Sequence, residues 1–178
     1  MIRLGRKLSA VLVLAVAVMV VAAPSSQSST SRSGARLTSL ETSLLQDLNQ
    51  VRAQYGLAAL RSSPLLVASA SQHTHEMGVD GYFEHSSHDG TSFSARISHW
   101  YAPAKHEWSV GENMLWYSPS VGARAAVSLW MGSPSHRANI LNPAWREIGI
   151  SAIHFPSAGG VYRGLPVTII TTDFGVRH

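Results

Sequence analysis

The sequence predicts an α+β protein in which an antiparallel sheet lies between layers of helices. Two features of the chain lead to this prediction. Apolar residues recur at steps of three and four through the first half, which is the helical period, whereas β-branched segments joined by a Gly/Pro-rich loop dominate the end. Helices that come first and strands that come last, close enough in the chain to pair with one another, are typical of this layered arrangement.

The first 23 of the 178 residues have the pattern of an export signal. Arg3, Arg6 and Lys7 form a basic start, and residues 10–23 are uncharged and almost purely aliphatic. Such a run is typical of a cleaved signal peptide, whereas a permanent spanning helix needs about 20 apolar residues and is the alternative. We therefore expect a secreted protein with no membrane span after removal of the leader, and retention at the cell wall is a further alternative.

Residues 24–36 are rich in Ser and Thr, which predicts a disordered spacer before a folded domain at 37–178. Three of the fourteen Lys and Arg lie in the leader, while all ten Asp and Glu follow residue 40, so the net charge falls from +4 to +1 when the leader is removed. With no Lys/Arg cluster remaining, nucleic acid is excluded as a predicted partner. The absence of cysteine excludes disulfides and thiolate metal sites, and no coiled-coil pattern predicts a dimer, so we expect a monomer.

Four helices are expected, each with a signal at its start or its end. Ser or Ser-Pro marks the starts, and Gly or Asn-Pro marks the ends. The expected helices are 37–55, ended by Gly56; 64–77, opened by Ser63-Pro64 and ended by Gly78; 121–131, capped by Ser120; and a short one from Ser133-Pro134 to Asn142-Pro143. Between Asp80 and Trp108 the helical period is lost, and Asp89-Gly90 predicts a turn.

Three strands are expected in the second half. Residues 148–153 and 167–172 are β-branched and are separated by the loop at 156–166. A third strand is expected at 112–117, with Met114 and Trp116 on one face.

Nine histidines are many for a chain of this length, and five of them lie between residues 73 and 99. No standard motif organises them, because His-Glu-x-x-His is incomplete and neither a Gly-x-Ser-x-Gly elbow nor a phosphate-binding Gly-rich loop occurs. His73 lies on the apolar stripe of the second helix, so we expect it to be a buried, hydrogen-bonded core residue. His88 and His99 are expected to be solvated loop residues.

The aromatic residues between 100 and 117 leave two interpretations open. They either line a groove for a lipid, sterol or glycan, or fill the layer between sheet and helix. They are Trp100, Tyr101, Trp108, Trp116 and Tyr117. Trp130 and Trp145 are expected in the core.

Three segments are more specific than any of these patterns. They are Phe83-Glu84-His85, Gly111-Glu112-Asn113, and the run His-Arg-Ala-Asn-Ile-Leu-Asn-Pro at 136–143. Together with Ile148-Gly149-Ile150 they closely resemble bacterial members of the CAP superfamily, whose relatives include cysteine-rich secretory proteins, antigen 5 and plant pathogenesis-related proteins. The resemblance covers about residues 40–175 and implies a three-layer α-β-α sandwich with a mainly antiparallel central sheet.

The resemblance places the family's cleft residues on His85, Glu112 and His136, and Asn139 lies beside them in the same run. In family members this cleft can hold a divalent cation such as zinc, so the resemblance implies a metal site at His85, Glu112 and His136. Two imidazoles, one carboxylate and a water are a known zinc set. His136 would be the third residue of its helix, where the dipole disfavours imidazolium and leaves the ring available as a ligand. A polar cluster that only fixes strand and loop is the alternative.

The chain departs from the family pattern in two places. Animal and plant relatives carry a second cleft glutamate shortly after the tryptophan that matches Trp130, whereas residues 131–135 here contain no acid. Ser135 stands where bacterial relatives usually have glycine. The cleft therefore has at most three of its four residues.

The resemblance favours a secreted, non-catalytic module that binds a small apolar or lipid ligand, a cell-envelope component or a partner, because family members are implicated in sterol or lipid binding and extracellular signalling. The alternative is a metal-dependent hydrolase acting on peptide or cell-wall substrates, with zinc on His85, His136 and Glu112 activating a water. No side chain beside these residues is marked as an activated nucleophile.

Overall fold

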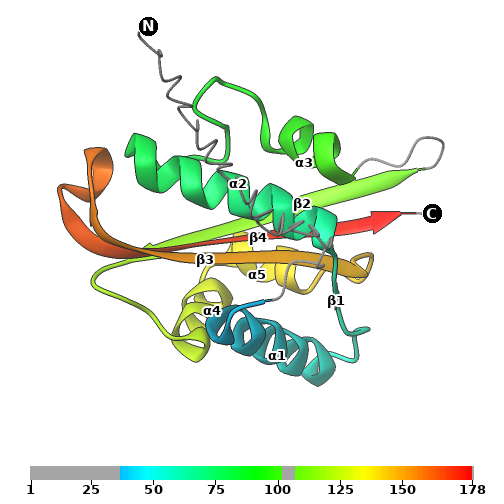
Figure 1. Ribbon diagram of the computed structural model, residues 1–178. Helices are drawn as coiled ribbons and strands as arrows, with labels where there is room; N and C mark the ends of the chain where they lie inside the picture. The colour runs from blue at the N-terminus through cyan, green and yellow to red at the C-terminus, as the bar shows by residue number, and fades with distance from the viewer. Residues whose placement is uncertain (1–36, 102–106, 178) are drawn as a thin grey trace, which may run out of the picture. The chain divides into compact units, whose positions relative to one another are not determined.

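The computed structural model describes residues 37–101 and 107–177, which form three layers, with a sheet between two sets of helices (Figure 1). In chain order the elements are α1 (Ser39–Gln54), β1 (Arg61–Ser62), α2 (Pro64–Asp80), α3 (Phe93–Tyr101), β2 (Trp108–Tyr117), α4 (Ala123–Gly132), α5 (Pro134–Ile140), β3 (Glu147–Ala158), the 3-10 helix η1 (Gly160–Tyr162) and β4 (Leu165–Arg177). None of the helices in these ranges is long and apolar enough to cross a bilayer. The expected leader and spacer at 1–36 lie outside the described residues.

The sheet has the strand order β1-β3-β4-β2. Antiparallel ladders join β3 to β4 and β4 to β2, so the prediction of a mainly antiparallel sheet is confirmed. The short β1 pairs with β3 in parallel, which makes the sheet mixed and was not predicted. The long strand β2 therefore forms one edge of the sheet.

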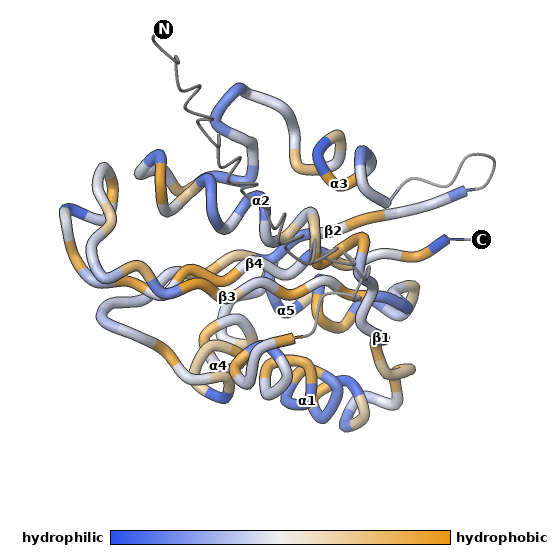
Figure 2. Tube along the Cα trace, viewed as in Figure 1, coloured by the Kyte–Doolittle hydropathy of each residue, from blue (hydrophilic) through white to orange (hydrophobic). Residues whose placement is uncertain are grey.

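The helices divide between the two faces of the sheet, with α2 and α3 on one and α1, α4 and α5 on the other (Figure 1). Side chains alternate along β4, so Ile169 packs with Met77 of α2 while Ile170 joins the cluster of α1 and α4. Met114 and Trp116 both lie on the α2 face, as predicted. In Figure 2 the central strands are predominantly hydrophobic, whereas α1 carries both hydrophobic and hydrophilic residues, as expected of a surface helix.

The predicted end of α2 at Gly78 is wrong. The helix continues to Asp80, and Gly81 ends it with the left-handed φ of 73° that favours glycine. Gly78 serves packing instead, because a Cβ there would lie 2.1 Å from the ring of Phe155.

The prediction of a loop through residues 93–101 is also wrong, since α3 occupies them. Only Arg96, Ile97 and Tyr101 of this helix are buried. Its nine residues therefore contain too few apolar positions for a helical periodicity to be detected in the sequence. His99 consequently lies on a helix. The predicted cap of α4, Ser120, is replaced by Gly122.

Several predictions for single residues, in the core and in the turn at Asp89-Gly90, are confirmed. His73 is fully buried, and its Nε2 lies 2.9 Å from the carbonyl oxygen of Glu84. Trp130 and Trp145 are buried in the cluster between α1 and the sheet. Asp89 accepts a hydrogen bond from the Thr91 amide in the predicted turn.

Candidate functional site

The predicted cleft residues meet at the edge strand β2, in a pocket of about 370 Å³. Successive residues of a strand point to opposite faces of the sheet. Because β2 is an edge strand, residues on both of its faces line this pocket. Glu112 therefore reaches the layer of α2 and α3, while Gly111 and Asn113 reach α5. The lining residues are His85, Phe93, Gly111, Glu112, Asn113, Ser135, His136 and Asn139, so His85, Glu112, His136 and Asn139 are all brought together.

Glu112 is held on both of its carboxylate oxygens. Its Oε1 lies 2.7 Å from Nδ1 of His85, and its Oε2 accepts from Nη2 of Arg96. The Glu112 side chain is fully buried, whereas 53% of the His85 side chain is exposed. Because a carboxylate only accepts, Nδ1 of His85 donates to Glu112, and Nε2 takes no part in this contact. The Arg96 guanidinium also donates to the carbonyl oxygen of His85, over 3.0 Å, and so fixes the loop that carries this histidine.

The α5 side of the cleft is held by two asparagines. Asn113 donates to the carbonyl oxygen of His136 over 3.1 Å, and Asn139 donates to Oδ1 of Asn113 over 3.0 Å. A Cβ on Gly111 would lie 2.6 Å from Oδ1 of Asn139, so only glycine permits this close approach. Burial, followed by the nearby His85, lowers the pKa of His136. The His136 ring is therefore neutral at pH 7.

A second carboxyl group lies directly behind Glu112. Asp173 is its register partner on β4 and is fully buried. Neither Asp173 oxygen has a hydrogen-bond partner among the described residues, and the same holds for Oγ of Ser69 and Nε of Arg96. Burial, and next the charge of Glu112, raise the pKa of Asp173 well above its usual range. Two buried carboxyl groups thus face one guanidinium.

Sequence reasoning missed Arg96, Asn113 and Asp173. Asn113 stands in the Gly-Glu-Asn segment, so a signal for it was present. Arg96 lies in the stretch between Asp80 and Trp108, where no helical periodicity marks any residue as buried. Asp173 could have been noticed, because an acidic residue beside an apolar, β-branched strand is unusual.

The aromatic residues between 100 and 117 do not gather in one groove. Tyr101 is fully buried beside Leu66 and Ile97, and Trp116 packs with the cluster of Met114. Trp100 and Tyr117 are 39% and 46% exposed. The structure therefore supports the layer-filling interpretation for Tyr101 and Trp116.

The arrangement does not fit a cation held by all three predicted ligands. Both oxygens of Glu112 are engaged by His85 and Arg96, and the guanidinium places positive charge against the carboxylate. In residues 37–101 and 107–177, no three His, Cys, Asp or Glu side chains have the spacing of a metal site. Only His85 Nε2 and the His136 ring remain as donors, and zinc sites normally have at least three protein ligands. Metal binding stays a prediction that these contacts do not support.

The fold and the cleft define an α-β-α sandwich with a His–Glu–Arg network at an open sheet edge. Residues 45–167 match the model of the CAP family, described as the cysteine-rich secretory protein family. The chain belongs to this family, as the resemblance predicted.

One curated relative is the uncharacterized membrane protein YlbC of Bacillus subtilis (strain 168), which is 28% identical over 113 residues. The match covers 64% of this chain and 31% of the relative, so the chain spans about a third of that protein.

Solved structures share the fold. An outer surface protein of Borrelia burgdorferi has a TM-score of 0.59 at 18% identity, over 76% of this chain and 90% of that one. An extracellular protein containing an SCP domain from Bacillus anthracis has a TM-score of 0.56 at 23% identity, over 78% and 44%. The venom allergen-like protein 4 of Schistosoma mansoni has a TM-score of 0.54 at 14% identity, over 80% and 91%. At these identities the similarity shows the fold alone.

Proposed function

We propose that the chain is an exported, non-catalytic CAP module whose β2 cleft binds a small amphipathic ligand of the cell envelope. The observation that carries this proposal is that polar side chains from three segments line one pocket of about 370 Å³, where hydrogen bonds hold His85, Asn113 and Asn139 before any ligand arrives. This volume falls within the roughly 300–1,000 Å³ typical of small-ligand sites. A site whose polar groups are already held in place binds with little ordering cost.

The pocket has polar groups for the head of an amphipathic ligand and apolar surface for its tail. The imidazoles of His85 and His136 meet a polar head group through their ring nitrogens. Phe93 supplies apolar surface beside them. The Glu112 carboxylate is already paired, so its part is to orient His85 rather than to bind the ligand.

The contacts of the cleft favour binding over hydrolysis. Ser135 is the one hydroxyl-bearing residue of the described lining, and its Oγ lies 3.5 Å from Oγ of Ser133 rather than beside an imidazole. A nucleophilic serine needs a base within hydrogen-bond reach. A zinc-activated water would need the three-ligand set that Glu112 does not complete.

The proposed location outside the cytoplasm rests on the leader at 1–23 and on the family. The similar proteins of Bacillus anthracis and Borrelia burgdorferi are named as extracellular and outer surface proteins. Intact-mass measurement of the protein from the culture medium tests this: a mature chain that begins near residue 24 or later is expected, and a cell-bound chain that retains Met1 would contradict it.

An NMR titration with octanoate, a small amphiphile, tests the cleft. The amide signals of Gly111, Asn113 and His136 are expected to shift, and the His85→Ala/His136→Ala double variant should bind at least about tenfold more weakly, since each lost contact is worth about 1 kcal/mol. His75→Ala, a change of an exposed histidine on α2, is the control and should bind like the parent. Shifts elsewhere than in the cleft would reject the proposed site.

Two further measurements address the hydrolase alternative. Zinc calorimetry is expected to show binding weaker than micromolar, because only two imidazoles are available. Stoichiometric zinc binding in the micromolar range that is lost in the double variant would contradict the proposal that the cleft functions without a metal. Turnover of a peptide, ester or peptidoglycan substrate that the same variant abolishes, with its fold intact, would overturn the non-catalytic assignment.

A further inference from the structure

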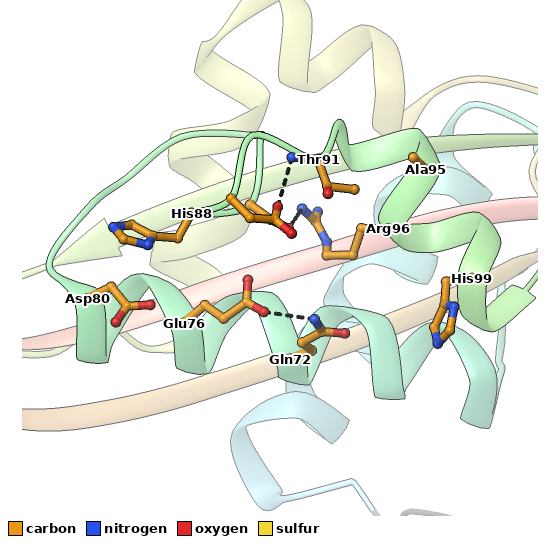
Figure 3. A pocket seen from close by; sticks show the side chains of 10 residues that line it. Gln72, Glu76, Asp80, His88, Thr91, Ala95, Arg96 and His99 are labelled. Atoms are coloured by element: carbon orange, nitrogen blue, oxygen red, sulfur yellow. Dashed lines mark hydrogen bonds between the residues drawn. The ribbon is translucent and has the colours of Figure 1, made fainter.

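A second pocket, of about 460 Å³, lies between α2, α3 and the loop that joins them. It is larger than the cleft and is linked to it through one residue, because Arg96 lines the second pocket and holds Glu112 of the cleft. Figure 3 shows Gln72, Glu76 and Asp80 in a row along α2, with His88, Arg96 and His99 opposite. Residues four apart lie on the same helix face, which is why this row forms one wall.

Hydrogen bonds fix Gln72 and Glu76 of this wall before any ligand binds. Gln72 donates to Oε1 of Glu76 over 2.7 Å and accepts from Nε1 of Trp100 over 2.9 Å. The hydroxyl of Tyr82 donates to the other oxygen of Glu76 over 3.4 Å. Burial, and next Glu76, raise the pKa of Tyr82 to about 12, so this hydroxyl keeps its proton. Gln72 and Glu76 of the wall are thus connected to Trp100 and Tyr82 in one chain of hydrogen bonds.

The charges around the pocket restrict what it can hold. Glu76, Asp80 and Asp89 contribute carboxylates, and none of them has a Lys or Arg ion-pair partner within the described ranges, so an anion is disfavoured. The Arg96 guanidinium in the same lining donates to Oγ of Ser87, so the pocket contains hydrogen-bond donors as well as acceptors. A divalent ion is disfavoured as well, because the part of the chain that the structure describes contains no three acidic or histidine side chains at metal-site spacing.

A neutral ligand rich in hydroxyl groups satisfies these restrictions. Each hydroxyl both donates and accepts, so it pairs with the carboxylates and with histidine ring nitrogens alike. Bonds from hydroxyls to ionised carboxylates are stronger than bonds between neutral groups. The pocket volume is within the roughly 300–1,000 Å³ range of small-ligand sites.

Trp100 lies beside this pocket, because its Nε1 donates to Gln72 of the lining. The residue is 39% exposed, and the ring of His99 stands edge-on to the indole with centroids 5.5 Å apart. The negative face of an aromatic ring attracts the polarised C–H groups of a sugar ring. An exposed, fixed indole beside a polar pocket is what an apolar sugar face would contact.

From this combination we propose that the α2–α3 pocket binds a neutral oligosaccharide. The sugar hydroxyls pair with Glu76, Asp80 and Asp89, and one sugar face stacks on Trp100. This site is separate from the β2 cleft, and the inference does not depend on the function proposed for the cleft.

Calorimetry and NMR with two probes, chitotetraose and cellotetraose, test the proposal on the exported protein. At least one probe is expected to bind, with amide shifts at Gln72, Glu76 and His99. Trp100→Ala should weaken binding at least tenfold, and Glu76→Gln several-fold. Trp100→Phe keeps a ring for stacking and is expected to retain most of the affinity, which separates loss of stacking from loss of fold.

Two control variants locate the site. Leu129→Ala changes an exposed side chain of α4, in the other layer, and His136→Ala changes the cleft, so both should bind the sugar like the parent. The proposal is overturned if neither probe binds, if Trp100→Ala binds as well as the parent, or if the shifts map to the cleft. Binding of spermidine in this pocket without binding of either sugar would also overturn it. The octanoate titration of the cleft is read separately, so either site can fail alone.

Discussion

The two faces of the sheet are built on different principles. On the face covered by α1, α4 and α5, large apolar side chains such as Trp130, Trp145 and Phe174 form one continuous cluster. On the face covered by α2 and α3, the helix approaches the sheet so closely that a Cβ on Gly149 would lie 2.0 Å from the carbonyl carbon of Leu66. That face also buries ionisable groups, including Arg96, Glu112 and Asp173.

The two faces therefore stabilise the fold in different ways. The α1 face provides apolar burial, the main stabilising term in folding. The α2 face has smaller apolar clusters and uses part of its interior to fix Glu112 and the loop that carries His85. Changes on the two faces should therefore destabilise the protein by different mechanisms, and the predictions below test this.

The largest effect is expected where α2 contacts the sheet. Gly149→Ala should destabilise the protein by about 4 kcal/mol or more, because the new methyl meets backbone atoms of Leu66 and Val67 that cannot rotate away. Gly132→Ala, at the end of α4, is the control: a Cβ there has no atom within 4 Å, so the change should stay within about 0.5 kcal/mol. Urea denaturation measures both, and equal effects would contradict the close-packed α2 face.

The next effect concerns the buried cations of the two faces. Arg96→Met should cost about 3–5 kcal/mol, because it leaves the Glu112 carboxylate buried without its partner. Arg52, on the α1 face, donates to backbone carbonyls such as those of Ile140 and Ala58, so Arg52→Met should cost less, about 2 kcal/mol. If the Arg52 variant lost as much stability as the Arg96 variant in denaturant titrations, the carboxyl pair would not be what distinguishes the α2 face.

A smaller effect is expected from pH. The pKa of Asp173 is raised in the folded state, so its folded form holds the proton more tightly than the unfolded chain does. Its contribution to stability is fully present below the ordinary carboxyl pKa of about 4 and is lost as pH rises from there toward the raised value. Asp173→Asn should remove this slope and be as stable as the parent or about 1 kcal/mol more stable at pH 7. Parallel stability curves for parent and variant from pH 4 to 8 would contradict the prediction.

The smallest effect concerns the cleft between the faces. NMR titration of the His136 ring should give a midpoint below the ordinary histidine value of about 6.5. In His85→Ala the midpoint should rise only partly, because burial is the larger cause of the lowering and the neighbouring His85 the smaller. A return to the ordinary value would show that His85, not burial, sets the pKa of His136.

Much of the fold followed from local patterns, whereas the members of the cleft followed from the family resemblance. Ser63-Pro64 and Ser133-Pro134 gave the starts of α2 and α5, and the β-branched segments gave β3 and β4. The motif segments named His85, Glu112 and His136, which the structure brings to one pocket. In contrast, α3 was missed, because a helix of nine residues with three buried side chains is too short for its hydrophobic periodicity to be detected in the sequence.

The sequence by itself predicted most of the helices and strands, because periodicity is a property of neighbouring residues. Through the family resemblance it also predicted that His85, Glu112 and His136 share one cleft. Only the tertiary structure decided that Arg96 takes the second oxygen of Glu112, and that Asp173 lies buried behind it. These contacts join residues 16 to 61 positions apart, and nothing local in the chain specifies them. For the same reason only the fold showed that Gly78 and Gly149 are glycines because α2 lies against the sheet.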